Sequence, residues 1–382
     1  MSLRRLLVFV SLALIVETSA YAAIGPLLPG LSETHGLDKG EAGLVTGAYP
    51  AGTLLLSLPA AWLVSRAGAR ATVIAGLATL AVASLCFGLA GSAILLAAAR
   101  FGQGAGAAAV WAGALAWVVA VAPRERRAEA IGTAVGAAIA GGLAGPVLGA
   151  AADGIGIGIV FGAYVALPVA MIVWASRLEG STSIPGMSPA AVRAAFGDPR
   201  MRRGMWLMAL PAVAFGLINV LVPLRLDELG AGAAVIALVF LAAIGLEALM
   251  SPFVGRLADR RGRIWPARVG LASGGVALAL VPLPHTIVLL ALAAMVAAPL
   301  LGMLWAPALA MLSDAAEARG LDSALGFGLA NLAWGIGAMT GTSGGGALAG
   351  ASVDAVPYLL VAGVALVTAW SLGRQNEPVP AL

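Results

Sequence analysis

Long apolar runs separated by short polar or charged breaks are the dominant pattern along this chain. Dividing the runs at charges and at Gly, Pro and Asp clusters gives twelve stretches, most of them long enough to cross about 30 Å of hydrocarbon. The stretches fall near residues 5–29, 42–65, 71–90, 93–120, 129–152, 156–176, 203–224, 232–254, 265–283, 286–312, 322–348 and 354–373. The pattern predicts an all-α membrane protein with twelve transmembrane helices.

A polar connection at mid-chain separates six apolar stretches from six. We expect an N-terminal six-helix bundle at 1–177, a cytoplasmic linker at 178–202 and a C-terminal six-helix bundle at 203–382. Similar residues recur at a near-constant spacing: Arg66 and Arg260 are 194 positions apart, and so are Trp111 and Trp305. The sequence therefore predicts two pseudo-symmetric halves, related by an axis along the membrane normal, with a cavity between them at the midplane.

The composition and the placement of charge support a membrane protein of defined orientation. The chain is 61% hydrophobic and 10% charged, whereas a soluble domain is usually about a quarter charged. With the N-terminus inside, nineteen arginines fall in cytoplasmic segments and only Lys39 and Arg225 fall in outer loops. This asymmetry predicts a multi-pass protein of a bacterial-type inner (plasma) membrane with both termini cytoplasmic. It accounts for the net charge of +4 without a nucleic-acid partner.

The first apolar stretch has an alternative interpretation. MSLRR, LLVFVSLALIV and SAYA together resemble a secretory signal with its cleavage site. The apolar run continues through AAIGPLLPGL, which favours a first membrane helix. A lone cysteine, Cys86, and two distant histidines do not make a metal site, and a phosphate-binding loop with Lys-Ser/Thr is not evident. We expect no cofactor and no metal.

Four segments carry recognisable motifs. They are GRLADRRGR at 255–263, a weaker copy AWLVSRAGAR at 61–70, Arg100-x-x-Gln103-Gly104-x-Gly106-Ala107-Ala108, and Gly141-x-x-x-Gly145-Pro146-x-x-Gly149. Together they resemble the signatures of the major facilitator superfamily over essentially the whole chain, and the last resembles its twelve-span drug:proton antiporter branch. The resemblance implies the major facilitator fold and secondary active transport by alternating access.

The charged loops are candidates for a conformational latch on the cytoplasmic side. The candidate residues are Asp259, Arg260, Arg263, Asp314, Arg66 and Arg70. The first-half loop departs from the family pattern, with Ser65 where an aspartate is expected and Ala61 where a glycine is expected. We therefore expect the second-half loop to carry more of the latch. The alternative is a set of solvated charges that fix topology and contribute about 0–1 kcal/mol per pair.

Small residues line one face of two stretches. The candidate packing residues are Gly141, Gly145, Pro146, Gly149, Gly337, Gly341 and Gly345. Glycines spaced by four lie on one helix face and let another backbone approach closely, while Pro146 removes one helical hydrogen bond. Two interpretations stay open: ordinary packing, or faces that let the halves rock against each other.

Three ionisable side chains lie well inside apolar stretches: Glu17, Arg100 and Glu247. Such residues are costly in hydrocarbon and mark functional sites. Burial disfavours the charged form of a carboxylate and a nearby cation favours it. We expect Glu17 to be the main proton or cation-substrate site, modulated by Arg100, with Glu247 as the second proton-coupling candidate. Alternatively, Arg100 only satisfies backbone carbonyls and Glu247 pairs elsewhere.

Aromatic and amide side chains near these charges are candidates for a substrate cavity. They are Tyr21, Gln103, Trp111, Asn219, Trp305, Asn331 and Trp334. Tyr21 lies one turn beyond Glu17 on the same helix face, and a buried amide requires partners. A mostly apolar, aromatic cavity with one or two carboxylates suits lipophilic cations.

The sequence therefore predicts a monomeric, proton-coupled exporter of small lipophilic or cationic compounds, with a small-molecule substrate, protons and the lipid bilayer as partners. The alternative within transport is an exporter or importer of a sugar, nucleoside or other metabolite, by uniport or symport. A membrane-embedded enzyme would need a clustered nucleophile, base or metal set, and a receptor would usually add a sizeable signalling domain. We expect neither.

Overall fold

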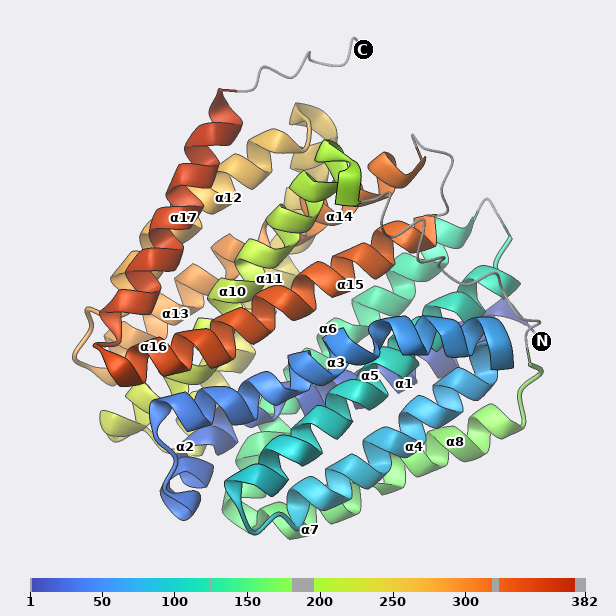
Figure 1. Ribbon diagram of the computed structural model, residues 1–382, viewed down its shortest axis with the longest axis horizontal. Helices are drawn as coiled ribbons and strands as arrows, with labels where there is room; N and C mark the ends of the chain where they lie inside the picture. The colour runs from blue at the N-terminus through green and yellow to red at the C-terminus, as the bar shows by residue number, and fades with distance from the viewer. Residues whose placement is uncertain (1, 124–125, 181–195, 318–322, 375–382) are drawn as a thin grey trace. The chain divides into compact units, whose positions relative to one another are not determined.

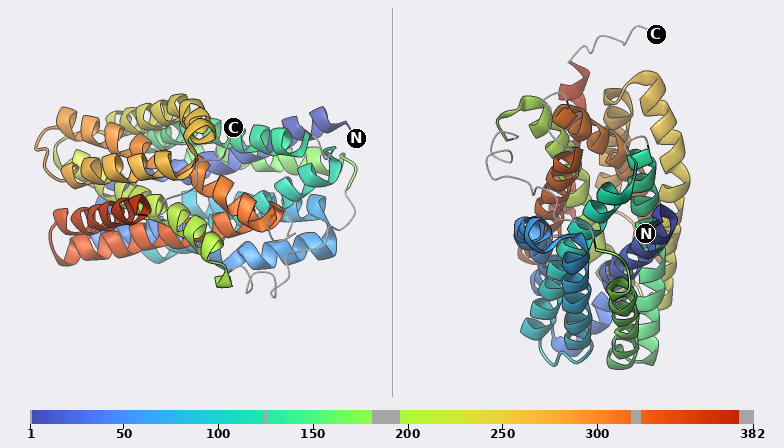
Figure 2. Two further views of the ribbon diagram at one scale, coloured as in Figure 1. Left: turned by 90° about the horizontal axis from the view of Figure 1, so that it is seen from above. Right: turned by 90° about the vertical axis from the view of Figure 1, so that its right-hand side faces the viewer.

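The computed structural model of the chain describes residues 2–123, 126–180, 196–317 and 323–374 (Figure 1). Within these ranges every regular element is a helix, and none is a strand. This confirms the all-α prediction. Figure 2 gives two further views of these helices.

Helices in the first half of the chain follow the predicted apolar stretches. They are α1 (Leu3–Ala22), α2 (Ile24–His35), α3 (Lys39–Ala67), α4 (Ala69–Gly88), α5 (Ala93–Val121), α6 (Arg127–Ile155), α7 (Ile157–Tyr164) and α8 (Ala166–Ser176). The first stretch is divided at Ala23, and α7 and α8 divide the sixth. Pro26 follows the first division and lacks an N–H, so the carbonyl of Ala22 loses its usual helical donor.

Helices in the second half repeat this order. They are α10 (Pro199–Glu228), α11 (Ala233–Arg261), α12 (Ile264–Leu280), α13 (Ile287–Gly302), α14 (Trp305–Glu317), α15 (Ser323–Met339), the π-helix η2 (Thr340–Gly344), α16 (Gly345–Ala351) and α17 (Ala355–Gly373). The eleventh apolar stretch is thus a single run, α15–η2–α16, with a π-helical turn at its centre. Single π turns inside α-helices occur frequently at functional sites.

Ten helical spans in the described residues are long and apolar enough to cross a membrane. Two expected stretches fall outside this count for physical reasons. Helix α12 has 17 residues, and the eleventh stretch is interrupted by η2. The chain is therefore a multi-pass membrane protein whose helices follow the apolar pattern of its sequence.

The chain forms two compact units by its internal contacts. The first is Met1–Gly36 with Ala48–Ser188, and the second is Leu37–Gly47 with Pro189–Leu382. Helix α3 therefore contributes its first residues to the second unit and the rest to the first. The sequence analysis did not foresee this exchange. The expected bounds 1–177, 178–202 and 203–382 stay a prediction.

Glycine faces bring helices close together within each unit. In the first unit, α6 packs on α1, and a Cβ on Gly141 would lie 2.6 Å from the carbonyl oxygen of Ile15. In the second unit, Gly337 and Gly341 lie against the α10 backbone at Ala209 and Val213. Both faces pack inside their own unit, so these contacts hold each bundle together. A rocking role for the glycines and Pro146 stays a prediction.

Candidate functional site

Glu17 lies on α1 in the interior of the first unit, with 3% of its surface exposed. Its Oε1 accepts a hydrogen bond from the hydroxyl of Tyr49 on α3. Its Oε2 accepts from Nε1 of Trp111 on α5 at 2.8 Å and from Oγ1 of Thr18 at 3.0 Å. Three helices thus meet at one carboxylate. Because a buried carboxylate is costly without partners, these three donors are what makes the position tolerable.

Arg100 on α5 is 1% exposed and lies beside this carboxylate without pairing with it. Its Nη1 donates to the carbonyl oxygen of Ala20 at 3.0 Å, and its Nη2 donates to that of Tyr21 at 3.3 Å. These carbonyls lie at the junction of α1 and α2, where the helical hydrogen-bond ladder is broken. Arg100 therefore satisfies backbone carbonyls, as one of the two sequence interpretations expected, and stabilises the junction.

Tyr49 links the arginine to the carboxylate. The Arg100 guanidinium lies 4.8 Å from the centroid of the Tyr49 ring, while the Tyr49 hydroxyl donates to Glu17. The ring of Tyr21 lies 4.9 Å from that of Tyr49. A cation over an aromatic face is attracted by the ring quadrupole. Tyr49 is therefore positioned by Arg100 and Tyr21, and it lies between two groups, the guanidinium and the carboxylate, that also interact through their charges.

Gln103 is fully buried. It was expected in a substrate cavity, but it has no exposed surface. Its Oε1 accepts from Nη1 of Arg100 at 2.9 Å, and its Nε2 donates to Oγ of Ser84 on α4 at 3.1 Å. Since Gln103 lies one helical turn from Arg100, its amide is used to hold the guanidinium. In this structure Gln103 fixes the arginine, and its place in a substrate cavity stays a prediction.

The candidate carboxylate in the second unit is Glu247 on α11. It is half-buried and accepts a hydrogen bond from Trp305 on α14. A Cβ on Gly302 would lie 2.6 Å from its carboxyl carbon, so the glycine leaves room for the acid. The ring of Phe215 lies 5.5 Å from that of Trp305. The repeat-related tryptophans, Trp111 and Trp305, thus each hold a carboxylate, although the two acids come from non-equivalent helices.

The other expected cavity residues lie in the second unit. Asn219 is half-buried on α10, and Asn331 and Trp334 are half-buried on α15. All three are placed on helices that pack against one another. Their role in binding a substrate stays a prediction.

The second-half loop contains part of the expected latch. Arg263 forms an ion pair with Asp314 of α14, and its Nη1 also donates to the carbonyl oxygen of Ala310 at 2.8 Å. Arg260 is exposed. The side chain of Asp259 lies outside the described residues. The pair that the structure provides is therefore Arg263 with Asp314.

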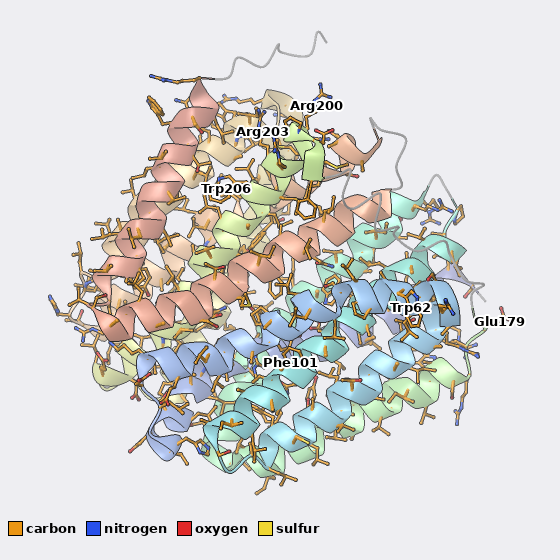
Figure 3. All side chains as sticks on the ribbon, viewed as in Figure 1. Trp62, Phe101, Glu179, Arg200, Arg203 and Trp206 are labelled. Carbon is orange, nitrogen blue, oxygen red and sulfur yellow. The ribbon has the colours of Figure 1, made fainter. Side chains whose placement is uncertain are left out.

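The first-half loop has a different arrangement. Arg66 lies 5.1 Å from the ring of Trp62, which is labelled on α3 in Figure 3. Arg70 donates from Nη1 to the carbonyl oxygen of Leu178 at 2.8 Å. Ser65, at the position expected to hold an acid, donates to the carbonyl of Trp62 at 2.7 Å. The two loops therefore hold their arginines in different ways, and a larger share of the latch in the second-half loop stays a prediction.

Tyr49 is the site residue that the sequence analysis missed. It carries no charge and belongs to no motif, so the search for ionisable residues passed over it. The available signal was its place in GAYP, where a tyrosine stands among small residues inside an apolar stretch. A search for metal ligands gives nothing in the described ranges, where no group of three or more His, Cys, Asp or Glu could hold an ion.

Comparison with known proteins shows which protein family the chain resembles. The model of the Major Facilitator Superfamily matches residues 10–320 and also residues 204–381. The MFS-type transporter ppzB of Metarhizium rileyi (strain RCEF 4871) is 29% identical over 133 residues, which is 34% of this chain and 28% of that relative. The chain thus aligns with under a third of that relative's length.

Two solved structures are similar over nearly the whole chain. Both are of a bacterial homologue of the human lysosomal transporter Spinster. The inward-facing, occupied form has a TM-score of 0.80 at 16% identity and covers 99% of each chain. The inward-facing, unoccupied form has a TM-score of 0.75 at 15% identity, covering 97% of this chain and 96% of that one. At 16% and 15% sequence identity, these similarities establish the fold alone. The family match extends over most of the sequence, and the chain belongs to the Major Facilitator Superfamily, whose members are secondary transporters of small molecules.

Proposed function

We propose that the chain exports small lipophilic or cationic compounds in exchange for protons, by alternating access. The observation that carries this proposal is Glu17, a carboxylate buried inside a membrane span and held by Tyr49, Trp111 and Thr18. An acid in this position can bind a proton or a cation, and losing one lets it take the other. That exchange is the chemical basis of antiport.

The neighbours of Glu17 support a switch between two forms. The hydroxyl of Tyr49 and the indole of Trp111 stabilise the ionised carboxylate by donating to it. A bound proton removes the charge and weakens both hydrogen bonds. Since the donors come from α3 and α5, protonation loosens two helices from α1. Proton binding is thereby coupled to helix packing inside the first unit.

Glu247 is the second coupling candidate, in the second unit. It has the same type of donor, the indole of Trp305. The two sites differ in charge. Glu17 has a cation nearby, Arg100, whereas the partner of Glu247, the indole of Trp305, is neutral. We propose that the two carboxylates bind protons independently, and that both contribute to the coupling.

The proposed orientation places both termini in the cytoplasm of a bacterial-type inner membrane. The basic residues support it: Arg200 and Arg203 lie together at the beginning of α10, with Trp206 one turn further (Figure 3). The Arg263–Asp314 pair then lies on the cytoplasmic side. We propose that this pair is a latch that holds the cytoplasmic side closed.

The alternative is transport of a sugar, nucleoside or other metabolite, by uniport or symport. One observation favours it. The two solved structures that the chain resembles are of a bacterial homologue of a human lysosomal transporter. This alternative uses the same fold and leaves the role of Glu17 as a cation site open.

The experiment is transport into proteoliposomes under an imposed pH gradient, with a panel of cationic, neutral and anionic compounds. We expect uptake of one or more lipophilic cations that depends on the gradient. Glu17→Gln and Glu247→Gln should each reduce that dependence. The matched control is Glu129→Gln, which changes an exposed glutamate of α6. Transport without proton dependence in the unmodified protein would remove antiport and favour the metabolite alternative.

A further inference from the structure

Arginines and exposed tryptophans lie together where α12 begins and α17 ends, two helices that pack against each other in the second unit. The guanidinium carbon of Arg374 lies 3.7 Å from the centroid of the Trp370 ring. On α12, Trp265 and Arg268 are three positions apart and therefore lie on one helix face. The exposed fraction is 39% for Trp265 and 58% for Trp370. The ends of two neighbouring helices thus present the same two residue types.

Arg268 reaches from α12 to α17. Its guanidinium lies against Gly373, where an added Cβ would be 2.5 Å from the guanidinium carbon. The glycine therefore leaves the space that the arginine occupies, and Arg374 is the next residue along the chain. Two cations thus lie at one helix crossing, each beside an exposed indole. We call this surface the arginine–tryptophan patch; it consists of Trp265, Arg268, Trp370 and Arg374.

The charge of the patch is not compensated by the protein in the part of the chain that the structure describes. There the ion pairs of arginines are Arg126 with Glu129, Arg225 with Glu228 and Arg263 with Asp314, and none of them includes Arg268 or Arg374. Both patch arginines are exposed. A membrane span has lipid around it, so an anion that complements this charge can come from the lipid.

Helix α10 adds a third exposed indole beside α17. Nε1 of Trp206 donates to Oγ1 of Thr368 on α17 at 3.2 Å, and 48% of the surface of Trp206 is exposed. Arg203 lies one turn nearer to the beginning of α10 (Figure 3). Tryptophan side chains are enriched at the level of the lipid headgroups. The three indoles therefore place the patch at the boundary between hydrocarbon and headgroups.

The short length of α12 brings headgroups toward Arg268. The 17 residues of this helix extend about 25 Å at 1.5 Å per residue, which is less than the ~30 Å of bilayer hydrocarbon. A bilayer adapts to a short span by thinning around it. Arg268 lies four residues after Ile264, about 6 Å along the helix. Thinning and the length of the arginine side chain together let its guanidinium meet a lipid phosphate.

We propose that the arginine–tryptophan patch binds the headgroup of an anionic phospholipid, with Arg268 and Arg374 as the groups that contact its phosphate. A guanidinium presents paired N–H donors that match phosphate oxygens. A zwitterionic phospholipid has the same phosphate but also a cation, which the patch repels. The site is formed by helices of the second unit and depends on neither substrate nor proton coupling. The proposed orientation decides only which leaflet supplies the lipid, the cytoplasmic one.

The test measures lipid binding to the purified full chain in detergent. Native mass spectrometry gives the dissociation constant of the first dioleoyl phosphatidylglycerol to bind, with dioleoyl phosphatidylcholine as the zwitterionic comparison. We expect phosphatidylglycerol to bind at least about fivefold more tightly, the factor that corresponds to about 1 kcal/mol for one basic residue near an anionic lipid surface. No transported substrate is needed.

Variants of the patch should weaken this binding. We expect Arg268→Gln and Arg374→Gln each to raise the dissociation constant for phosphatidylglycerol about fivefold and to leave that for phosphatidylcholine unchanged. Arg268→Lys keeps the charge and should restore most of the affinity. The matched control is Arg126→Gln, which removes an exposed arginine whose charge Glu129 already compensates, and it should leave both constants unchanged.

A second measurement covers the case in which the Arg268 variants fail to fold. Arg374 is exposed at the end of α17, so Arg374→Gln is compatible with the fold. Because a ligand stabilises the state that binds it, phosphatidylglycerol should raise the unfolding temperature of the unmodified protein more than that of Arg374→Gln. Equal affinities for the two lipids, or arginine variants that bind phosphatidylglycerol as tightly as Arg126→Gln does, would overturn the lipid site. If Glu17→Gln and Glu247→Gln both keep proton-driven transport, the proposed coupling fails while the lipid site stands.

Discussion

Trp111 donates its indole N–H to Glu17 at 2.8 Å, and this hydrogen bond joins α5 to α1 across a buried carboxylate. Trp305, at the repeat-related position 194 residues later, donates to Glu247 on α11. The tryptophan at the repeat-related position is thus the donor in both units, whereas the acid lies on α1 in the first unit and on α11 in the second. The tryptophans are therefore better markers of the two acid sites than the acids themselves.

Replacing each tryptophan by phenylalanine removes the donor and keeps most of the ring. We expect Trp305→Phe to reduce gradient-driven transport more than Trp111→Phe, because Glu17 retains Tyr49 and Thr18 as donors. Initial uptake rates in proteoliposomes measure the difference. The control is Trp370→Phe, an exposed tryptophan of α17. Equal losses for both site variants would contradict the assigned difference in donors.

Tyr49→Phe removes the hydroxyl donor from Glu17 while leaving the ring under Arg100. The ionised carboxylate loses one of three hydrogen bonds, so its protonated form becomes relatively more favourable. A hydrogen bond to a charged group is worth about 1.5–3 kcal/mol. We therefore expect the pH of half-maximal transport to move upward by about one unit or more. Uptake measured across a pH series tests this.

The tyrosine experiment has a matched control in Tyr358→Phe. Tyr358 is also buried, but it lies on α17 in the second unit. Its replacement should leave the pH profile in place. A profile that is the same in Tyr49→Phe and the unmodified protein would show that the Tyr49 hydroxyl does not control Glu17.

Gly141→Ala tests the close contact between α6 and α1. The new Cβ would lie 2.6 Å from a backbone oxygen of Ile15, and overpacking of this kind costs about 1–3 kcal/mol. We expect a lower temperature of thermal unfolding in detergent. Gly136→Ala, on the same helix, places its Cβ in open space and should be neutral or stabilising by up to about 1 kcal/mol. The prediction fails if the two variants unfold alike.

Asp314→Asn tests the proposed cytoplasmic latch. The pair with Arg263 is more than a third exposed on both sides, so its contribution is about 0–1 kcal/mol and a shift in conformational populations of up to about fivefold is expected. Accessibility of a cysteine introduced on the cytoplasmic side measures the shift. Arg261→Ala, which changes an exposed arginine of the same charged segment that is not a latch candidate, serves as the control. If the accessibility of the cysteine is the same in Asp314→Asn and in the unmodified protein, these charges only fix the topology of the chain.

The apolar pattern predicted the helices well because lipid forces each span to satisfy its own backbone hydrogen bonds. The breaks inside spans were harder to predict. The division between α1 and α2 was signalled by Pro26, but the π-helical turn at Thr340–Gly344 had no comparable signal in the sequence. The exchange of Leu37–Gly47 between units depends on contacts with residues some 300 positions away, which periodicity cannot reveal.

The candidate site was predicted residue by residue but not as an assembly. Glu17 and Trp111 were both named, yet they are 94 positions apart and their contact depends on how two helices are rotated. Gln103 was named for a cavity, and its hydrogen bond to Arg100 was not named, although a spacing of three places both residues on one helix face. Tyr49 was missed because neutral aromatics are common in membrane spans. A charged residue inside an apolar stretch can be recognised from the sequence as a candidate site residue. Which side chains it contacts depends on how the helices pack, and the sequence pattern does not give this.

The division of α3 between the two units also has a pharmacological consequence. Tyr49 follows Gly47 by two residues, so α3 contributes a segment to the second unit and, directly after it, a hydroxyl that donates to Glu17 in the first unit. An antibody fragment that binds the short connection at 36–38, between α2 and α3, would need no access to the interior of the protein. Any effect of such binding on transport would therefore not require competition with a cargo for the interior.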